Sequence, residues 1–453
     1  ISIIKYRLLD IEVFGIVAIA TSVFTILRMV QTLGFSGALV QKGEISDDLV
    51  DSVLWLVVAV SLGLSVGVAG LSGYLARLYE TPVLNGILLV FAALFVINAL
   101  PLIQQSVLSR DLQFKVIGLI NVAGAISSGL ITVVLAYLGY GVWSLVMGAV
   151  ASSLVSLVLY TLYCPWKPRL VFRRHMIRET AKFSLNVTLC KTLSILRQQA
   201  PQLLIGKLLG TEVLGLFTFA RNLILLFVNQ IDAMMASVLF PVFARLQGDN
   251  RAIERAYHKI NHYTFIAVVP FVVGFTLLGT DLVAIVYGSK WLSAIGIAQL
   301  LLLATMLNSV YSKGSSVIAG KGRPELLVKI EAAALPATLL GLFVVAPMGL
   351  MPIVLVIVTT TALAFAAQLL ILKKLIGWSW RRAARSISNP LLASLGMTII
   401  VLAAQALLGA PAGEVPLFVT FVLLGAFAYA VTLFILEKDE LKQTALLLMR
   451  KSE

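Results

Sequence analysis

Long apolar runs recur along this chain and constrain its fold more than any other feature. About 20 consecutive apolar residues are enough for a helix to cross the hydrocarbon core of a bilayer. Charged residues make up 12% of the chain and mean hydropathy is +0.99, whereas soluble proteins carry about 25% charged residues. An all-α polytopic membrane fold is therefore predicted, with spans at 12–39, 52–76, 82–108, 115–138, 141–163, 180–206, 212–244, 261–280, 293–312, 326–346, 350–372, 386–408 and 415–436.

The residues before the first of these spans indicate one more helix. Residues 1–9 resemble the end of a transmembrane segment, and the chain begins with Ile1 rather than Met. We expect a first helix that is truncated here. The full chain would then have 14 spans, counting the 13 above.

A repeat separated by 200 residues suggests how these spans are organised. Leu8–Ala20 and Leu208–Ala220 share six identical positions, and most of the others exchange one apolar residue for another. Such repeats in membrane transporters usually relate two lobes with a site between them. We predict two six-helix lobes around a central cavity, plus two C-terminal helices. The expected parts are an N-terminal lobe at 1–163, a basic inter-lobe loop at 164–178, a second lobe at 179–375, two additional helices at 376–437 and a tail at 438–453.

The positions of Lys and Arg test this topology independently. Loops assigned to one side carry 26 of the 35 basic residues, as expected for cytoplasmic loops. Both termini are therefore predicted to be cytoplasmic. The net charge of +14 has this ordinary explanation, so no nucleic-acid partner is expected.

Four basic residues fall inside predicted spans: Arg28, Lys191, Arg197 and Arg221. A charge at the bilayer centre costs about 2.5–3.5 kcal/mol on insertion scales, so such groups usually face a water-filled cavity. The alternative for those near a helix end is that the side chain reaches the interface. Helical spacing places Thr21, Thr25, Arg28 and Thr32 on one stripe.

Other polar residues accompany these bases. Asp232 lies eleven residues after Arg221, about 20° away around a helix and about 16 Å along it. Asn222, Asn229 and Gln199 could offer hydrogen bonds to a sugar. With four bases weighed against Asp232, an anionic ligand such as a phosphate, a diphosphate or an acidic sugar is predicted. The alternative is a set of Arg–Asp pairs that hold helices together, and Asp232 is also the candidate for ion coupling.

No constellation for catalysis is recognisable. The sequence lacks a phosphate-binding Gly-rich loop, and its cysteines and histidines have no metal-ligand spacing. We therefore expect neither an enzyme nor a cofactor or metal.

Several segments, taken in order, resemble the polysaccharide-transporter family of bacterial flippases, in particular the Wzx-type O-antigen and colanic-acid exporters. The resemblance covers nearly the whole chain. No single segment is decisive, but the segments in this order are specific to the family. The segments are Arg7–Leu9 with Phe14 and Gly15, Ala38–Gln41, Arg110–Lys115, Gly139–Leu145, Pro165–Pro168, Leu203–Gly206 and Leu239–Leu246.

The resemblance implies a fold of the multidrug/oligosaccharidyl-lipid/polysaccharide exporter superfamily. It implies movement of undecaprenyl-diphosphate-linked oligosaccharide across the bacterial inner membrane by alternating access, with a cationic cavity. A polysaccharide polymerase and a chain-length regulator are implied as partners. Many relatives have an acidic residue where this chain has Ala200 and Pro201, which puts carboxylate-based ion coupling at that position in doubt.

Three other functions are alternatives to this one. A drug or cation antiporter of the same superfamily would favour an acidic cavity. A membrane polysaccharide polymerase would need a long extracytoplasmic loop, and the longest predicted, about 280–292, is too short. A non-transporting scaffold would not need buried bases.

Overall fold

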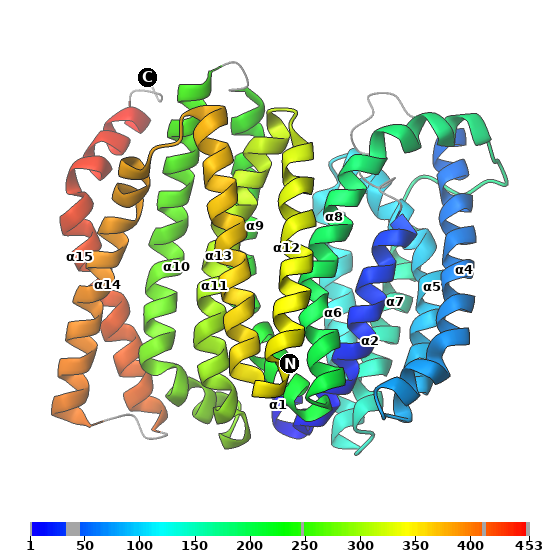
Figure 1. The fold of residues 1–453 in the computed structure, drawn as a ribbon, viewed down its shortest axis with the longest axis horizontal. Coiled ribbons are helices and arrows are strands. Elements are labelled where there is room, and N and C mark those ends of the chain that lie inside the picture. Colours follow the sequence, from blue (N-terminus) through cyan, green and yellow to red (C-terminus); the bar gives the residue numbers. More distant parts are fainter. Residues whose placement is uncertain (1, 33–45, 246–248, 410–413, 450–453) are drawn as a thin grey trace. The chain divides into compact units, whose positions relative to one another are not determined.

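The computed structural model describes residues 2–32, 46–245, 249–409 and 414–449. Within these ranges the side chains at 2, 176–191, 229, 231–245 and 439–449 lie outside the description. The described secondary structure is helical throughout (Figure 1).

The long helices follow one another with short connections. A short helix, α1 (Ser2–Leu8), precedes them, and the 3₁₀ segments η1 (Ser289–Ala294) and η2 (Ala346–Met348) lie between them. The long helices are α2 (Ile11–Thr32), α4 (Asp47–Leu78), α5 (Val83–Arg110), α6 (Phe114–Tyr137), α7 (Val142–Tyr163), α8 (Arg174–Leu208), α9 (Thr211–Arg245), α10 (Asn250–Val286), α11 (Ile295–Gly320), α12 (Pro324–Val345), α13 (Leu350–Ile376), α14 (Trp380–Leu408) and α15 (Val415–Met449).

Each predicted span corresponds to one of these long helices, so the all-α polytopic fold class is confirmed. Within the described residues, 12 segments are long and apolar enough to cross a membrane. The segment in α9 is Thr211–Val228, and α8 is not among the 12. The predicted stretch 33–39 and the loop residue Lys42 lie outside the described residues.

The described chain forms two compact units. Unit 1 consists of residues 1–218 and 331–356, and unit 2 of residues 219–330 and 357–453. Unit 1 therefore includes α8, which was assigned to the second predicted lobe. The arrangement of two repeated six-helix lobes stays a prediction.

In unit 1, α2 packs against α4, α5 and α8, and the pairs α4–α5 and α6–α7 lie side by side. A Cβ atom added to Gly148 of α7 would lie 2.1 Å from Oγ1 of Thr132 in α6. Only glycine permits this approach, which is the way small residues bring helices together in membranes. Buried Val53, Ile103 and Trp166 belong to a core between α4, α5 and the segment after α7.

The segment between α7 and α8 is shorter than the predicted loop 164–178. It ends at Arg173, because α8 begins at Arg174. One face of α4 holds it: Asp51 Oδ1 accepts from Arg169 N at 3.0 Å, and Trp55 Nε1 donates to Arg169 O at 2.8 Å. Ser52 Oγ accepts from Arg173 N at 2.8 Å. The segment is thus docked through its backbone on consecutive turns of one helix.

In unit 2, α10 packs against α11, α14 and α15. The core between α10, α14 and α15 includes Leu278, Met397 and Phe421. Tyr429 of α15 donates its hydroxyl to the Ile266 carbonyl at 2.8 Å. These contacts attach the last two helices to the middle and the last part of α10.

Several helices begin before the apolar spans that they contain. α10 starts at Asn250, where the Asp249 carboxylate accepts from the backbone N–H groups of Arg251 and Ala252 at 2.8 and 3.1 Å. Its 37 residues give a length of about 55 Å, beyond the roughly 30 Å of a hydrocarbon core. Basic residues predicted in a loop therefore lie on the helix. Likewise α15 continues to Met449, into the predicted tail.

Candidate functional site

The two copies of the sequence repeat meet in unit 1. A Cβ atom on Gly15 of α2 would lie 1.8 Å from the Thr211 carbonyl oxygen, and one on Gly215 of α9 would lie 2.1 Å from the Ile11 carbonyl oxygen. Both separations, Gly15 to Gly215 and Ile11 to Thr211, are 200 positions, so the contact is reciprocal. Thr211 Oγ1 also donates to Glu12 Oε1 at 3.0 Å. The identical glycines let the first turns of the repeated helices touch through their backbones.

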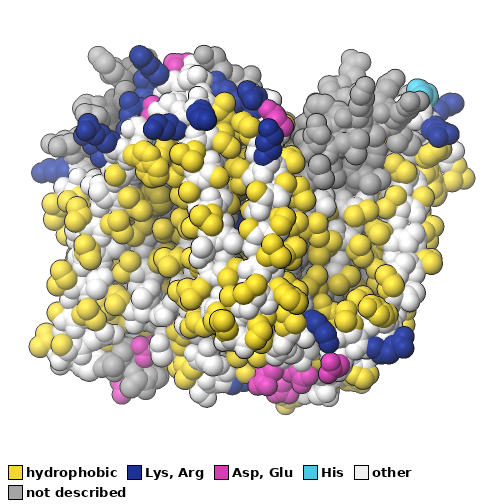
Figure 2. All heavy atoms as spheres, in the orientation of Figure 1, with side chains coloured by type: hydrophobic (Ala, Val, Ile, Leu, Met, Phe, Trp, Pro, Cys, Tyr) yellow, Lys and Arg dark blue, Asp and Glu magenta, His cyan; other side chains and the backbone are white. Residues whose placement is uncertain are grey.

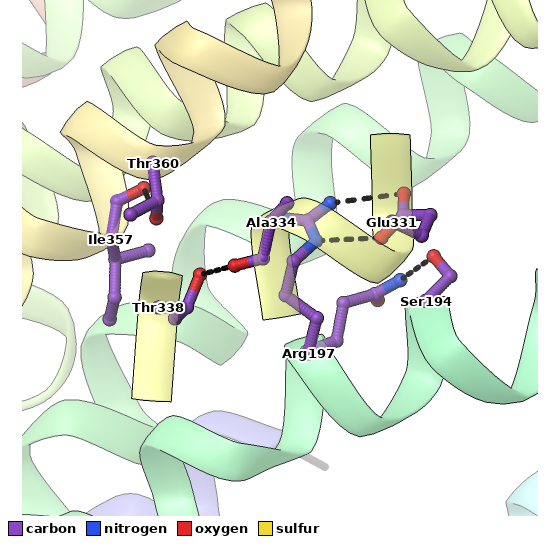
Figure 3. A network of polar contacts seen from close by, with 8 residues as sticks. Ser194, Arg197, Glu331, Ala334, Thr338, Ile357 and Thr360 are labelled. Atoms are coloured by element: carbon purple, nitrogen blue, oxygen red, sulfur yellow. Dashed lines mark hydrogen bonds and ion pairs between the residues drawn. The ribbon is translucent and has the colours of Figure 1, made fainter. Parts of the chain in front are cut away.

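Arg197, predicted to bind an anionic ligand, is paired with a carboxylate inside unit 1. Its Nε lies 2.8 Å from Glu331 Oε2 and its Nη2 lies 3.5 Å from Oε1 (Figure 3). Arg197 lies on α8 and Glu331 on α12, with exposed side-chain fractions of 8% and 3%. A two-pronged contact of this kind is strong when both groups are out of water.

This ion pair corrects the predicted charge balance. Asp232 was weighed alone against four interior bases, but Glu331 also lies inside a predicted span, 326–346. Its charge is matched to Arg197. The signal was present in the sequence, since Glu331 is an acidic residue within an apolar run. Arg197 is therefore a weaker candidate for direct ligand binding than Arg28 or Arg221.

Gln199, predicted to contact a sugar, lies near α2. The Ser22 hydroxyl is within hydrogen-bond distance of Gln202 Oε1 and lies 3.3 Å from Gln199 Oε1. A hydroxyl has one proton, so it can donate to only one of these amides at a time. Ser22 and Gln202 are buried, and they form a polar contact between α2 and α8.

Arg28 lies on the predicted polar stripe of α2. Its side chain is exposed, and it makes neither an ion pair nor a hydrogen bond within the part of the chain that the structure describes. The threonines of the stripe differ, because Thr21, Thr25 and Thr32 donate to carbonyls of their own helix. Arg28 is thus the stripe's available cation.

Arg221 and Asn222 lie near the start of α9, in unit 2. Arg221 is half-buried, and within the described residues it has no ion pair or hydrogen bond. Asn222 is exposed. Arg28 belongs to unit 1, so a site shared by Arg28 and Arg221 rests on the sequence and stays a prediction.

The remaining predicted residues lie on helices, but their side chains fall outside the described residues. Lys191 belongs to α8, and Asn229 and Asp232 belong to α9. Their roles stay predictions.

One interior base was missed because the predicted span ended at residue 312, whereas α11 continues to Gly320. Lys313 was assigned to the loop after span 293–312, yet it lies within α11 and is 2% exposed. Its Nζ donates to Ser309 O and Ser309 Oγ at 2.9 and 3.0 Å. The apolar residues that continue to Ile318 could have indicated that the helix extends further.

The described residues contain no group of three or more His, Cys, Asp or Glu side chains that could hold a metal ion. What they do contain is polar side chains that face other helices inside apolar bundles. Together with the 12 described candidate spans, this defines a polytopic α-helical membrane protein with charged groups in its interior.

A family model described as "Polysaccharide biosynthesis protein" matches residues 6–296, more than half of the chain. The chain therefore belongs to this polysaccharide biosynthesis family. The resemblance inferred from the sequence segments is confirmed.

Two curated relatives and one solved structure place the chain further. It is 24% identical over 407 residues to "Lipopolysaccharide biosynthesis protein WzxC" of Escherichia coli, covering 87% of this chain and 81% of the relative. It is 25% identical over 321 residues to "Succinoglycan biosynthesis transport protein ExoT" of Rhizobium meliloti, covering 71% and 65%. The fold matches "Lipid II flippase MurJ, inward closed conformation" with a TM-score of 0.74 and 15% identity, over 97% of this chain and 96% of that one.

Proposed function

We propose that this protein moves an undecaprenyl-diphosphate-linked oligosaccharide across the bacterial inner membrane by alternating access. The names of its relatives support a role in transport during polysaccharide biosynthesis. The fold supports it as well, since it matches a protein named as a lipid II flippase. The glycan would be a repeat unit of a capsule, an exopolysaccharide or an O-antigen.

The observation that carries the proposal is Arg28 inside an apolar helix, without a partner among the described residues. Arg28 lies about 26 Å along the axis from Ile11, the first residue of α2. A guanidinium so placed needs water or an anion, and its planar donors suit a phosphate oxygen pair. Arg221 would supply a second guanidinium. Arg197 is already matched by Glu331, so it would position α8 rather than bind the diphosphate.

The reciprocal glycine contact supports alternating access. Alternating access requires one end of the path to close while the other opens. Backbone contact between the first turns of α2 and α9 would close one end, and its opening would release the cargo. Lys191, Gln199, Asn222 and Asn229 would line the path, and Asp232 would couple it to an ion.

The distribution of basic residues supports the orientation. Both termini would lie in the cytoplasm, so the glycine contact would face the opposite side of the membrane. A polysaccharide polymerase and a chain-length regulator would be the partners there. The chain itself would act without catalysis.

A vesicle assay tests the activity. Purified protein is reconstituted into liposomes containing a fluorescent undecaprenyl-diphosphate sugar, and quenching by dithionite reports its outward movement. Arg28→Gln and Arg221→Gln are each expected to lower the rate at least tenfold. Arg77→Gln, at the exposed end of α4, is the matched control and should retain the wild-type rate. If wild-type protein moves no lipid, the proposed function is wrong. If both variants keep the full rate, the site assignment is wrong.

A cross-link tests the mechanism separately. Glu12→Cys and Thr211→Cys, combined in a variant without native cysteines, are bridged by a short thiol-specific reagent. Lipid movement should stop when the bridge forms and return when it is reduced, while either single cysteine should be insensitive. Continued movement with the bridge intact would rule out opening at this contact.

A further inference from the structure

Unit 2 contains a cavity of about 930 Å³ that belongs to no part of the proposed path. It lies between the first turns of α10 and the connection from α13 into α14. Figure 2 shows that Lys and Arg gather at this end of the unit 2 helices, while hydrophobic side chains cover the lengths below. The cavity is therefore at the polar end of this bundle.

The charge of the cavity lining is strongly positive. Five bases line it, Arg251, Arg255, Lys259, Arg382 and Arg385, with Glu254 as the carboxylate among them. The α10 bases recur every four residues, so they lie on one face of the helix. Those of α14 are three residues apart, again on one face.

Among the described residues, one of these bases has its charge matched. Arg382 forms an ion pair with Glu254, whose side chain is 6% exposed. Arg251, Arg255, Lys259 and Arg385 are exposed, and no carboxylate among the described residues is within ion-pair distance of them. The lining thus keeps several cations for an external anion.

Asp249 lies near the cavity, but its carboxylate accepts hydrogen bonds from the backbone at the start of α10. The pKa of its carboxyl is lowered by the backbone hydrogen bond from Ala252, then by that from Arg251 and by the charges of Arg255 and Arg251. It does not line the cavity. Its single charge leaves the basic excess in place.

The inner wall of the cavity is held by buried contacts. His258 stacks on Trp378 with ring centroids 6.2 Å apart, and its Nε2 lies 3.7 Å from Glu254 Oε1. His262 Nδ1 lies 2.8 Å from the Ser386 carbonyl oxygen, and its Nε2 lies 2.8 Å from Glu437 Oε1. These contacts tie α10 to α14 and α15, so the wall is preorganised. A preorganised wall loses less conformational entropy when a ligand binds.

The depth of the cavity in the membrane favours a phosphate. The apolar part of α10 begins near Thr264 and has 23 residues to Val286, about 34 Å of helix, which accounts for the hydrocarbon core. The preceding bases then lie at the depth of lipid headgroups. Arginine binds phosphate through paired N–H donors, and lysine adds a point charge.

We propose that this cavity is a binding site for a phosphate-bearing anion, separate from the path of the transported lipid. The anion is the headgroup of an anionic phospholipid or a soluble diphosphate. Either one would link α10 to α14 across the cavity. The proposal does not depend on the transport function.

Full-length protein tests this with two probes and two variants. Native mass spectrometry compares retention of phosphatidylglycerol with that of phosphatidylcholine, and calorimetry measures binding of inorganic pyrophosphate. The cavity variant is Arg255→Gln with Arg385→Gln. Its matched control is Lys373→Gln with Lys374→Gln. These two lysines are exposed near the C-terminal end of α13, but they do not line the cavity.

The cavity variant should lower binding at least tenfold, while the control stays within twofold of wild type. Loss in the lipid arm alone identifies a headgroup, loss in the pyrophosphate arm alone identifies a soluble anion, and loss in both identifies the phosphate itself. No binding of either probe by wild type, or equal loss in cavity and control variants, overturns the proposal. If the first cavity variant misfolds, Arg251→Gln with Lys259→Gln is judged by the same criteria.

Discussion

Gly15 and Gly215 each lie against a backbone carbonyl of the other's helix, although 200 residues separate them. The built Cβ positions are 1.8 and 2.1 Å from the Thr211 and Ile11 oxygens, distances that no side chain tolerates. The repeat is thus more than a trace of shared ancestry between two segments. Its glycines are required where the two copies touch.

Replacement of Gly15 by Ala tests this contact. The added methyl must push α2 away from α9, and overpacking of this kind costs about 1–3 kcal/mol. We expect a lower melting temperature of the purified protein, measured by intrinsic fluorescence. Gly63→Ala is the control, since a Cβ there meets nothing within 4 Å, and better helix propensity should stabilise it slightly. Equal melting temperatures for the two variants would contradict the close contact.

The Arg197–Glu331 pair predicts a strong asymmetry between single and double substitutions. Glu331→Gln leaves a buried guanidinium uncompensated, which costs about 3–5 kcal/mol. Arg197→Met combined with Glu331→Leu removes both charges and should recover most of that stability. Denaturation of wild type, Arg197→Met, Glu331→Leu and the double variant completes a double-mutant cycle and gives the coupling energy.

The exposed Arg169–Asp47 pair provides a matched control for this cycle. Its atoms are 3.1 Å apart, and the side chains are 62% and 59% exposed. Asp47→Asn should cost no more than about 1 kcal/mol, as surface pairs usually do. If Glu331→Gln lowered the free energy of unfolding by as little as Asp47→Asn, then Arg197 would be hydrogen-bonded to water or to another anion in the variant.

Ser22→Ala is expected to loosen the contact between α2 and α8. It removes the hydroxyl that reaches Gln202 and leaves a buried amide oxygen without its donor, at a cost of about 1–3 kcal/mol. Thermal unfolding measures the loss. Thr25→Ala, which removes a hydroxyl bonded only within α2 in the described contacts, should be nearly neutral. A Ser22→Ala protein as stable as the Thr25→Ala protein would show that water replaces the hydroxyl.

Asp51→Ala should release the segment between α7 and α8. Asp51 is fully buried and accepts from the Arg169 backbone, so its removal frees a segment rich in trypsin sites. Limited trypsin digestion should cleave after Arg169 and Arg173 several-fold faster than in wild type. Asp48→Asn, which removes only the exposed 3.6 Å pair with Arg173, should change the rate little. Unchanged cleavage in Asp51→Ala would mean that the other contacts suffice.

Much of the fold was predictable because a bilayer imposes a simple rule. Every backbone polar group in the hydrocarbon must be satisfied within its own helix, so helices coincide with apolar runs. All 13 predicted spans correspond to long helices for this reason. The ends were less predictable. The helix α10 begins in its polar part, outside the apolar span, where the Asp249 carboxylate caps its first turn. Hydropathy therefore does not mark where such a helix begins.

The candidate site was predictable in part. Apolar context alone identifies Arg28 and Arg221 as unusual, and both remain without partners among the described residues. Glu331 and Lys313 were assigned to loops or overlooked because they lie within a turn or two of a helix end. Near a helix end, a hydropathy average includes both the charged residues of the loop and the apolar residues of the span, so it does not show which of the charged residues are buried.

The sequence by itself determined the membrane class, the approximate positions of the long helices among the described residues and the presence of a repeat, because these follow from local composition and from self-similarity. Only the tertiary structure decided that Arg197 is neutralised by Glu331, 134 positions away, and that the repeated glycines touch. Both depend on which helix faces lie against each other. That choice comes from packing between distant segments, and no local pattern along the chain encodes it.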